Sequence, residues 1–175
     1  MSRRVSMNAR MAFDAQTTAE TEVALFVFEH ENLTAPLRLS TDPTERLSAD
    51  PLMYGTRSTW DGADPQTDPY LYVLMSAEMP GDLEDTPASS TIVLENVDND
   101  IAAVLRGFTN MATVHMAMVL ASSPDLIEVE YRGMKLLSSE GNGDEVRLTI
   151  GRRPIEEENV PMDRTTKQRF PGSYG

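Results

Sequence analysis

The sequence contains no cysteine and only two histidines, His30 and His115. The absence of cysteine excludes disulfides, iron–sulfur clusters, thiolate zinc sites and cysteine nucleophiles. The two histidines are the only possible imidazole ligands. No run of about 18 apolar residues occurs, so no segment is long and apolar enough to cross a membrane as a helix. We therefore expect a protein without a metal or another cofactor that does not enter a membrane.

The sequence motifs of common enzyme classes are also missing. There is no G-x-S-x-G nucleophile elbow, no phosphate-binding P-loop, no G-x-G-x-x-G fingerprint and no H-E-x-x-H zinc motif. A Ser-His-Asp triad would need His30 or His115, and His115 falls in the middle of an expected strand. Among 28 acidic residues some pair of carboxylates always has a suitable separation, so a glycosidase-like pair carries little information. We expect no enzymatic activity.

Charge is distributed unevenly along the chain, which has a net charge of −13. Residues 41–100 hold 13 acids against Arg46 and Arg57, a net charge of −11 for this stretch. An acidic body repels phosphate, so we expect no specific binding to nucleic acid. Both ends of the chain are basic, and basic ends can contact the acidic faces of neighbouring copies. The residues predicted to lie at subunit contacts on this basis are Arg3, Arg4, Arg10, Arg164, Lys167 and Arg169.

The hydrophobic pattern predicts mainly β structure. Residues 21–30, TEVALFVFEH, are apolar on both faces of a strand, which indicates a strand buried on both sides. Two strands within residues 127–151 meet at Gly141-Asn142-Gly143, a hairpin signal. Further strands are expected at 37–40, around 52–57 within a long loop, and at 70–77, 91–95 and 113–122, with helices at 4–16 and after Asp98.

These elements predict a mainly β fold of the α+β type with one or two short helices. The sheet is expected to be a mixed or antiparallel β-barrel, or a sandwich-like domain. A chain of 175 residues with 40% hydrophobic content can bury one sizeable core. We expect residues 1–20 to form an N-terminal amphipathic helix or arm, residues 21–152 the β-rich domain, and residues 153–175 an extended C-terminal arm.

The stretch STWDGADPQTDPY places Asp61, Asp64 and Asp68 beside the only tryptophan, Trp60. A calcium loop needs oxygen ligands at its first, third and fifth positions and a glycine at the sixth, and these aspartates are not spaced in that way. The two Asp-Pro pairs instead predict turns. Trp60 is either an anchor for a neighbouring subunit or a residue of the chain's own core.

The order of elements resembles a family of minor tail proteins of long-tailed bacteriophages that is classified as a domain of unknown function. The resemblance rests on AFDAQTTAETEVALFVFEH, YGTRSTW with DPQTDPY, STIVLENVDNDIAAVLR, EVEYRGMKLLSS and RFPG. YGTRSTW and RFPG are its most specific parts. The layout is also similar to the amino-terminal part of the tail-tip protein L of lambda-like phages. That protein adds a cysteine-rich carboxy-terminal segment, which this cysteine-free chain lacks.

The resemblance implies a structural component of the virion tail tip or baseplate hub, made in the cytoplasm of a host bacterium. It implies a homo-oligomeric ring, a trimer in preference to a hexamer, between the end of the tail tube and the central hub or fibre. Its neighbours would be a distal tail or tube protein, the tape measure protein and the central hub or fibre protein. The alternative function, from another class, is a soluble ligand-binding or hydrolytic β-domain with an acidic pocket.

Two further expectations concern the acidic loop at residues 79–90 and the C-terminal arm. Asp82, Glu84 and Asp85 are expected to face either a DNA channel, which an acidic wall would keep free of bound DNA, or solvent. The composition of residues 153–175 alone predicts disorder. Their spaced apolar residues, however, lead us to expect an arm ordered by another subunit, with Phe170 buried in a pocket of that subunit.

Overall fold

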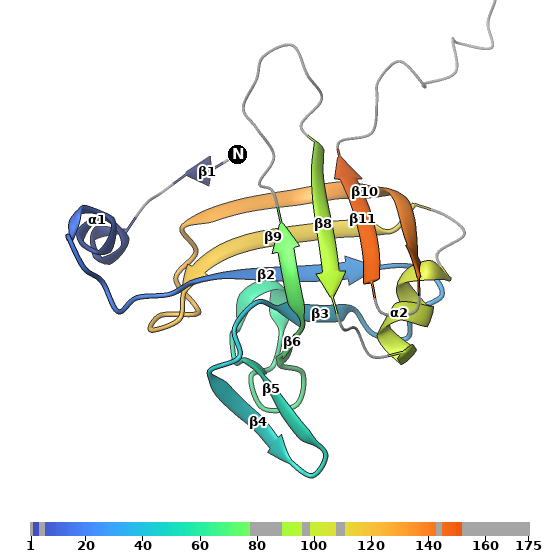
Figure 1. Cartoon of the computed structure of the whole chain (residues 1–175), viewed down its shortest axis with the longest axis horizontal. Helices are drawn as coiled ribbons and strands as arrows, with labels where there is room; N and C mark the ends of the chain where they lie inside the picture. Colours follow the sequence, from blue (N-terminus) through green and yellow to red (C-terminus); the bar gives the residue numbers. More distant parts are fainter. Residues whose placement is uncertain are drawn as a thin grey trace, which may run out of the picture.

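The computed structural model describes residues 2–3, 6–77, 89–95, 99–107, 111–142 and 145–151. Figure 1 shows a body of curled strands, with one helix standing apart from it and one hairpin projecting away from it. In chain order the elements are β1 (Ser2–Arg3), α1 (Met7–Asp14), β2 (Glu22–Glu29), β3 (Leu37–Ser40), β4 (Glu45–Ala49), β5 (Leu52–Thr56), the 3-10 turn η1 (Trp60–Gly62), β6 (Tyr70–Tyr72), β7 (Leu74–Ala77), β8 (Ser89–Glu95), α2 (Asn99–Arg106), β9 (Thr113–Leu120), β10 (Val129–Asn142) and β11 (Glu145–Gly151).

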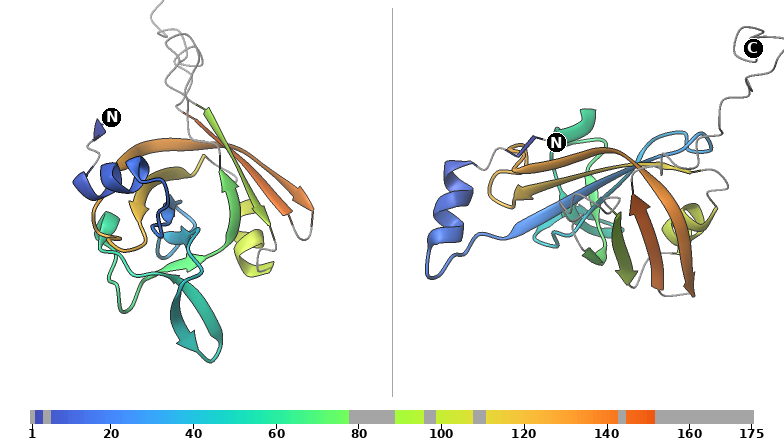
Figure 2. Two further views of the ribbon diagram at one scale, coloured as in Figure 1. Left: turned by 60° about the vertical axis from the view of Figure 1, so that its left-hand side comes forward. Right: turned by 90° about the horizontal axis from the view of Figure 1, so that it is seen from above.

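The strands form one mixed sheet that curls into a half-barrel (Figures 1 and 2). The order is β4-β5-β6-β3-β2-β9-β10-β11-β8-β7, and β1 pairs with β10. All described pairings are antiparallel except that of β3 with β6. Only Val73 separates β6 from β7, although β6 pairs with β3 and β5 whereas β7 pairs with β8. The chain at Val73 therefore connects distant parts of the sheet, and this connection requires the sheet to curl.

Strand β2 lies at the centre of the sheet and is buried on both faces, as its sequence predicted. Val23, Leu25 and Val27 face a smaller cluster that contains Trp60 and Tyr70. The opposite side chains of β2, Ala24, Phe26 and Phe28, face the larger core, to which β8, β9, β10, β11 and α2 contribute. A continuous apolar run was a reliable signal here because only a strand covered on both sides can bury every residue along it.

The prediction of a mainly β, mixed fold with one or two short helices is confirmed. Helix α1 begins at Ser6, whose Oγ accepts a hydrogen bond from the Ala9 N–H at 3.0 Å. In the part of the chain that the structure describes, no helix is long and apolar enough to cross a membrane.

Two predictions about strands were incomplete. Residues 45–49 form β4, although they were expected to belong to a loop, and the expected strand at 70–77 is interrupted at Val73. The sequence of β4, ERLSA, has no clear alternation because this strand buries little of its surface. Val73 breaks the long strand because its N–H donates to the Ser40 carbonyl, away from the pairing of β7.

Candidate assembly surface

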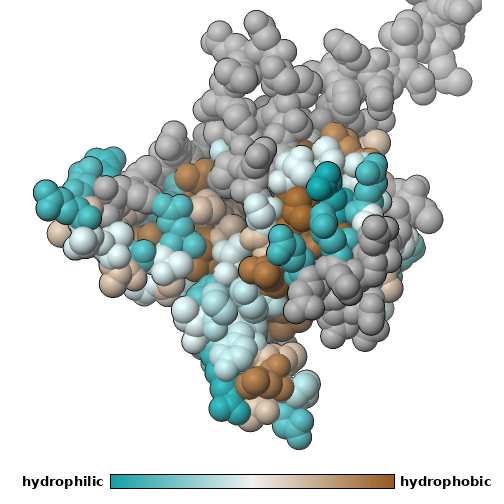
Figure 3. Space-filling view, viewed as in Figure 1, coloured by the Kyte–Doolittle hydropathy of each residue, from teal (hydrophilic) through white to brown (hydrophobic). Residues whose placement is uncertain are grey.

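The hairpin formed by β4 and β5 projects from the body (Figure 1). At its foot, only Gly55 and Thr56 pair with β6. Beyond them, residues 49–54, which we call the hairpin tip, are all exposed. The tip nevertheless carries three consecutive large apolar residues, Leu52, Met53 and Tyr54, of which Leu52 is 60% exposed. Figure 3 shows hydrophobic surface over this projection. Three such residues together on a projecting ribbon are typical of a protein contact surface.

Residues 55–60, which we call the hairpin base, have the opposite character, and they contain most of the YGTRSTW motif. Gly55 lies so close to β6 that a Cβ on it would be 1.9 Å from the Tyr70 carbonyl oxygen. Only glycine fits at this crossing. Next to it, Thr56 is buried and shares a 2.7 Å hydrogen bond with the buried hydroxyl of Ser40. These two residues fix the foot of the hairpin against the barrel.

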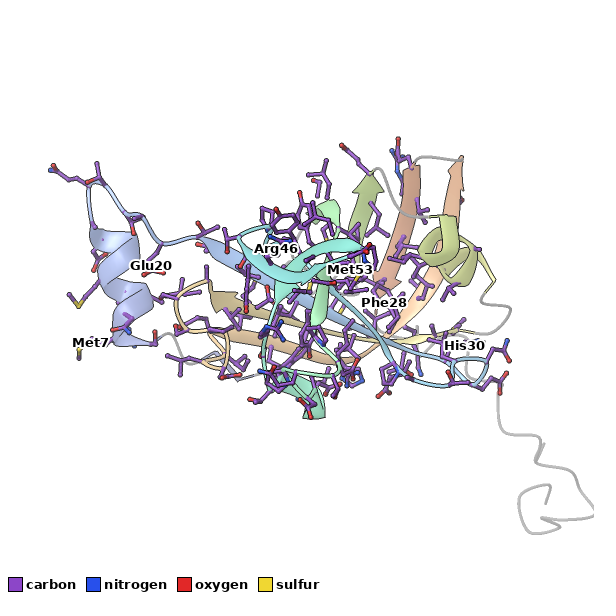
Figure 4. The ribbon with its side chains drawn as sticks, turned by 90° about the horizontal axis from the view of Figure 1, so that it is seen from below. Met7, Glu20, Phe28, His30, Arg46 and Met53 are labelled. Carbon is purple, nitrogen blue, oxygen red and sulfur yellow. The ribbon has the colours of Figure 1, made fainter. Side chains whose placement is uncertain are left out.

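Arg57 connects the hairpin to the loop that follows it. Its Nε donates to Glu45 Oε1 at 2.8 Å, and its two terminal nitrogens donate to the carbonyl oxygens of Pro65 and Leu47. Glu45 and Leu47 belong to β4, whereas Pro65 belongs to the loop before β6. The guanidinium therefore restricts how far the hairpin can swing relative to that loop. Figure 4 shows this hairpin from below, with Arg46 and Met53 labelled on it.

Ser58 and Thr59 attach the base to the loop before β10. The Ser58 hydroxyl donates to the Pro124 carbonyl at 2.8 Å, and the Thr59 N–H donates to Asp125 Oδ1 at 2.7 Å. The Thr59 hydroxyl donates to the same oxygen at 2.8 Å. The bond from the Thr59 N–H, followed by that from its hydroxyl, lowers the pKa of Asp125. Asp125 therefore holds the base most strongly when it is ionised.

Trp60 ends the base and is buried in the chain's own smaller core, where it is 6% exposed. Its indole N–H donates to Glu130 Oε1 at 3.0 Å, and its ring stacks on Tyr70 with centroids 6.0 Å apart. The Tyr70 hydroxyl donates to the Trp60 carbonyl at 2.7 Å. Burial raises the pKa of Tyr70. Of the two roles expected for Trp60, the structure shows the intramolecular one.

The cation above this tryptophan comes from a distant part of the chain. The Arg132 guanidinium carbon lies 5.8 Å from the centre of the Trp60 ring. Arg132 also donates to Asp61 Oδ1 at 2.5 Å and to Glu130 Oε1 at 2.6 Å. Burial would lower the pKa of Arg132, but its bonds to Asp61 and Glu130 raise it. The aromatic ring, the cation and the two carboxylates together fix η1 against β10.

Each aspartate of the STWDGADPQTDPY stretch has a partner within the protein. Asp61 bonds to Arg132, and Asp68 forms an ion pair with the buried Arg38. Asp64 Oδ1 accepts the N–H groups of the next two non-proline residues, and these bonds lower its pKa. The predicted turn at Asp64-Pro65 is thus confirmed as a turn closed by the aspartate side chain. Among the described residues, no group of three or more His, Cys, Asp or Glu could hold a metal ion.

Of the other predicted site residues, the structure describes only Arg3 and Arg10. Arg10 is exposed on α1, and Arg3 lies in β1 opposite Val129. The remaining predicted interface residues and the predicted channel residues lie outside the described part of the chain: Arg4, Arg164, Lys167, Arg169, Phe170, Asp82, Glu84 and Asp85.

Sequence reasoning missed the partners of the base, Asp125, Glu130 and Arg132. They lie 66 to 71 residues away from the residues that they bond. Nothing in the sequence marks them, since each is one charged residue among many.

One pocket lies at the far end of β2. It is open, has a volume of about 360 Å³, and is lined by Glu29, His30, Glu31, Met111 and Thr113. His115 Nε2 lies 3.6 Å from Glu29 Oε2. The pocket combines two carboxylates with an imidazole and an apolar wall, a chemistry suited to a small cationic or polar ligand.

No family model matches the chain, and no curated protein is significantly similar to it in sequence.

Proposed function

We propose that this protein is a structural subunit of the tail tip of a long-tailed bacteriophage, and that its copies form a ring. The observation that carries the proposal is the contrast within the β4–β5 hairpin, where an exposed apolar tip stands on a fully bonded base. A monomer gains nothing from holding Leu52, Met53 and Tyr54 rigidly in water, whereas an interface does. The tip would insert into an adjoining subunit of the ring.

The resemblance to phage minor tail proteins adds support from the sequence. Its most specific internal motif, YGTRSTW, consists of Tyr54, the last residue of the tip, and the whole base. The motif residues make the contacts that orient the hairpin, so a family that shares the motif would share the projecting hairpin. In this proposal the ring is a trimer in preference to a hexamer, and it lies between the tube end and the central hub. Its role is structural and not enzymatic.

Electron microscopy of tailed particles that carry this protein tests the proposal. An antibody against the chain should label the end of the tail that is distal to the head, and it should not label the tube or the capsid. Label elsewhere on the particle, or no label on intact particles, would contradict the proposal.

A variant of the hairpin tip tests separately whether its exposed apolar residues form the assembly surface. Leu52→Ser with Tyr54→Ser should leave the protein folded and remove it from the particles. The matched control is Leu137→Ser, which changes an exposed leucine on β10, 38% exposed and away from the tip. The control protein should be incorporated normally. Equal incorporation of the tip variant and the control would show that the tip is not the assembly surface.

The pocket at Glu29 favours a second candidate function, a ligand-binding β-domain with an acidic pocket. Native mass spectrometry of the purified protein separates the two candidates. Monomers that carry a stoichiometric small molecule, with the molecule lost in a Glu29→Gln variant, would favour ligand binding. Ligand-free rings would favour the structural role.

A further inference from the structure

The described part of the N-terminal arm comprises residues 2–3 and 6–14, and it pairs with the body through a very short strand. In β1, Ser2 lies opposite Glu130 and Arg3 lies opposite Val129. This antiparallel pairing spans two residues, as do those of β3 and β5 with β6, but β1 pairs with no second strand among the described residues. A two-residue ladder contributes little stability by itself, so the arm can leave β10 without disturbing the barrel.

Among the described residues, the edge of β10 that β1 contacts has no partner strand between residues 131 and 134. Strand β9 pairs with one edge of β10 along residues 129–135. On the other edge, β11 begins only where Gly151 lies opposite Lys135. The backbone of residues 129–134 on that edge is therefore outside the β10–β11 ladder. An open strand edge accepts an added strand from any chain that can reach it.

Helix α1 is held to the body by few of its described residues. The Ser6 N–H donates to the buried side chain of Glu128 at 2.6 Å, and Ala9 is fully buried. Met7 and Met11, one helical turn apart, are 77% and 66% exposed. Among the described residues, α1 therefore docks through Ser6 and Ala9, and Met7 and Met11 remain exposed.

An exposed linker connects α1 to β2. Residues 15–20 are all exposed. The next contact with the body is at Thr21, whose carbonyl accepts a hydrogen bond from the Ala121 N–H at 2.9 Å. Six extended residues can span about 20 Å. Figure 4 shows Met7 and Glu20 on the same side of the molecule, with the helix separated from the sheet by this connection. A linker of this length is long enough for the arm to extend away from its own barrel.

We infer that the arm is exchanged between copies, so that β1 and α1 of one subunit dock on β10 of its neighbour. The inference rests on the proposed ring and names a contact that would hold it together. An exchanged arm makes the same strand pairs and the same Ser6–Glu128 bond as an arm docked on its own chain, so exchange loses no contact. It also places Met7 and Met11 at the junction between subunits, where a neighbour can cover them. Within a closed ring, every arm and every β10 edge is occupied once.

Disulfide trapping in the cysteine-free chain tests the exchange directly. Arg3 and Val129 are directly opposite residues of an antiparallel pair, a geometry within the range of a disulfide. An Arg3→Cys chain is mixed with a Val129→Cys chain that carries a size tag, at a concentration where rings are seen by electron microscopy. Oxidation should give the tagged heterodimer as the dominant product on a non-reducing gel. The matched control replaces Val129→Cys by Asn32→Cys, an exposed position next to His30 at the far end of β2, and should give only trace heterodimer.

A second variant separates this inference from the proposed function. Arg3→Cys and Val129→Cys in the same chain should give a ladder of covalent oligomers when rings are present. Rings with only internally bridged monomers would overturn arm exchange and leave the ring intact. A chain that stays monomeric at every concentration would overturn both. If the double variant does not fold, the mixing experiment with single variants decides, because each of those chains carries one mild substitution.

Discussion

The tip and the base of the β4–β5 hairpin are neighbours in sequence but opposite in physical character. Every residue of the tip is exposed, and its large side chains make it apolar. The base is mostly buried, and it places a hydroxyl, a guanidinium and an indole in contacts with three other parts of the chain. The base thus contributes to the stability of the barrel, whereas the tip contributes almost nothing to it.

This difference assigns the residues of the base to stabilising the fold and the residues of the tip to the proposed assembly. A hairpin that served the fold alone would pack Leu52 and Tyr54 onto the barrel, as β2 packs its own apolar residues. The bonded base instead holds these side chains away from the body. Substitutions in the base should therefore change the free energy of unfolding, and substitutions in the tip should change association only.

The largest effect is expected for Gly55→Ala in the base. The added Cβ would lie 1.9 Å from the Tyr70 carbonyl oxygen and 2.8 Å from Leu47 Cδ1, so β5 and β6 would have to separate. We expect destabilisation of more than about 3 kcal/mol, or failure to fold, in urea unfolding. The control is Gly62→Ala, where no atom lies within 4 Å and only the left-handed backbone at φ +71° resists the change. Equal stability of Gly55→Ala and the wild type would refute the close crossing.

A comparable loss is expected when the indole is removed from the base. Trp60→Ala should destabilise the protein by about 3–5 kcal/mol, because it empties a buried site and leaves Glu130 without the indole N–H. Trp60→Phe should recover part of this loss, since it restores the ring but not the hydrogen bond. The fluorescence of Trp60, the only tryptophan, follows unfolding in the wild type, and circular dichroism follows it in both variants. A loss below about 1 kcal/mol for Trp60→Ala would place the indole outside the core.

A smaller, pH-dependent effect is expected at Asp125. Its folded-state pKa lies below the ordinary value of 3.8, so its contribution to stability is fully present above that value. The contribution is lost as the pH falls through the lowered pKa. Asp125→Ala should therefore cost about 0.5–1 kcal/mol at pH 7, because water screens this exposed carboxylate, and less at pH 3, as measured by urea unfolding at both. An equal cost at the two pH values would show that the charge of Asp125 plays no part.

The smallest effect on stability is expected in the tip. Leu52→Ser with Tyr54→Ser should change the free energy of unfolding by less than about 1 kcal/mol, because Leu52 is 60% exposed and Tyr54 38% exposed. Thermal unfolding of dilute protein, at concentrations where no rings form, gives this value. A clear destabilisation of the monomer would mean that the tip packs on its own chain, and the contrast between tip and base would be wrong.

The parts of the fold that the sequence predicted are those with a local signal. The β2 run, the hairpin of β10 and β11 and the strand-helix succession at β8 and α2 each carry their pattern within about twenty residues. The position of that hairpin's turn was predicted less well, because Gly141 and Asn142 belong to β10 and pair with Val146 and Glu145. Strand β4 was missed because its residues are neither alternating nor continuously apolar. The curling of the sheet at Val73 was also missed, because it depends on pairings between strands that are far apart in sequence.

The candidate site was predictable only in part, for a related reason. The sequence singled out Trp60 and the Asp-Pro turns because tryptophan, aspartate and proline each have strong local preferences. It could not decide whether Trp60 faces a partner or the core, since that depends on Glu130, Tyr70 and Arg132. The exposure of Leu52 was equally hidden, because an apolar residue in a strand is expected to be buried.

The mass of the purified protein in solution tests the central claim most directly. Light scattering during size exclusion should show a closed oligomer of the wild-type chain, a trimer in preference to a hexamer, and a monomer for Leu52→Ser with Tyr54→Ser. The Leu137→Ser control should keep the oligomer. A wild-type chain that remains monomeric up to its solubility limit, or a tip variant that forms the same oligomer as the wild type, would contradict the account.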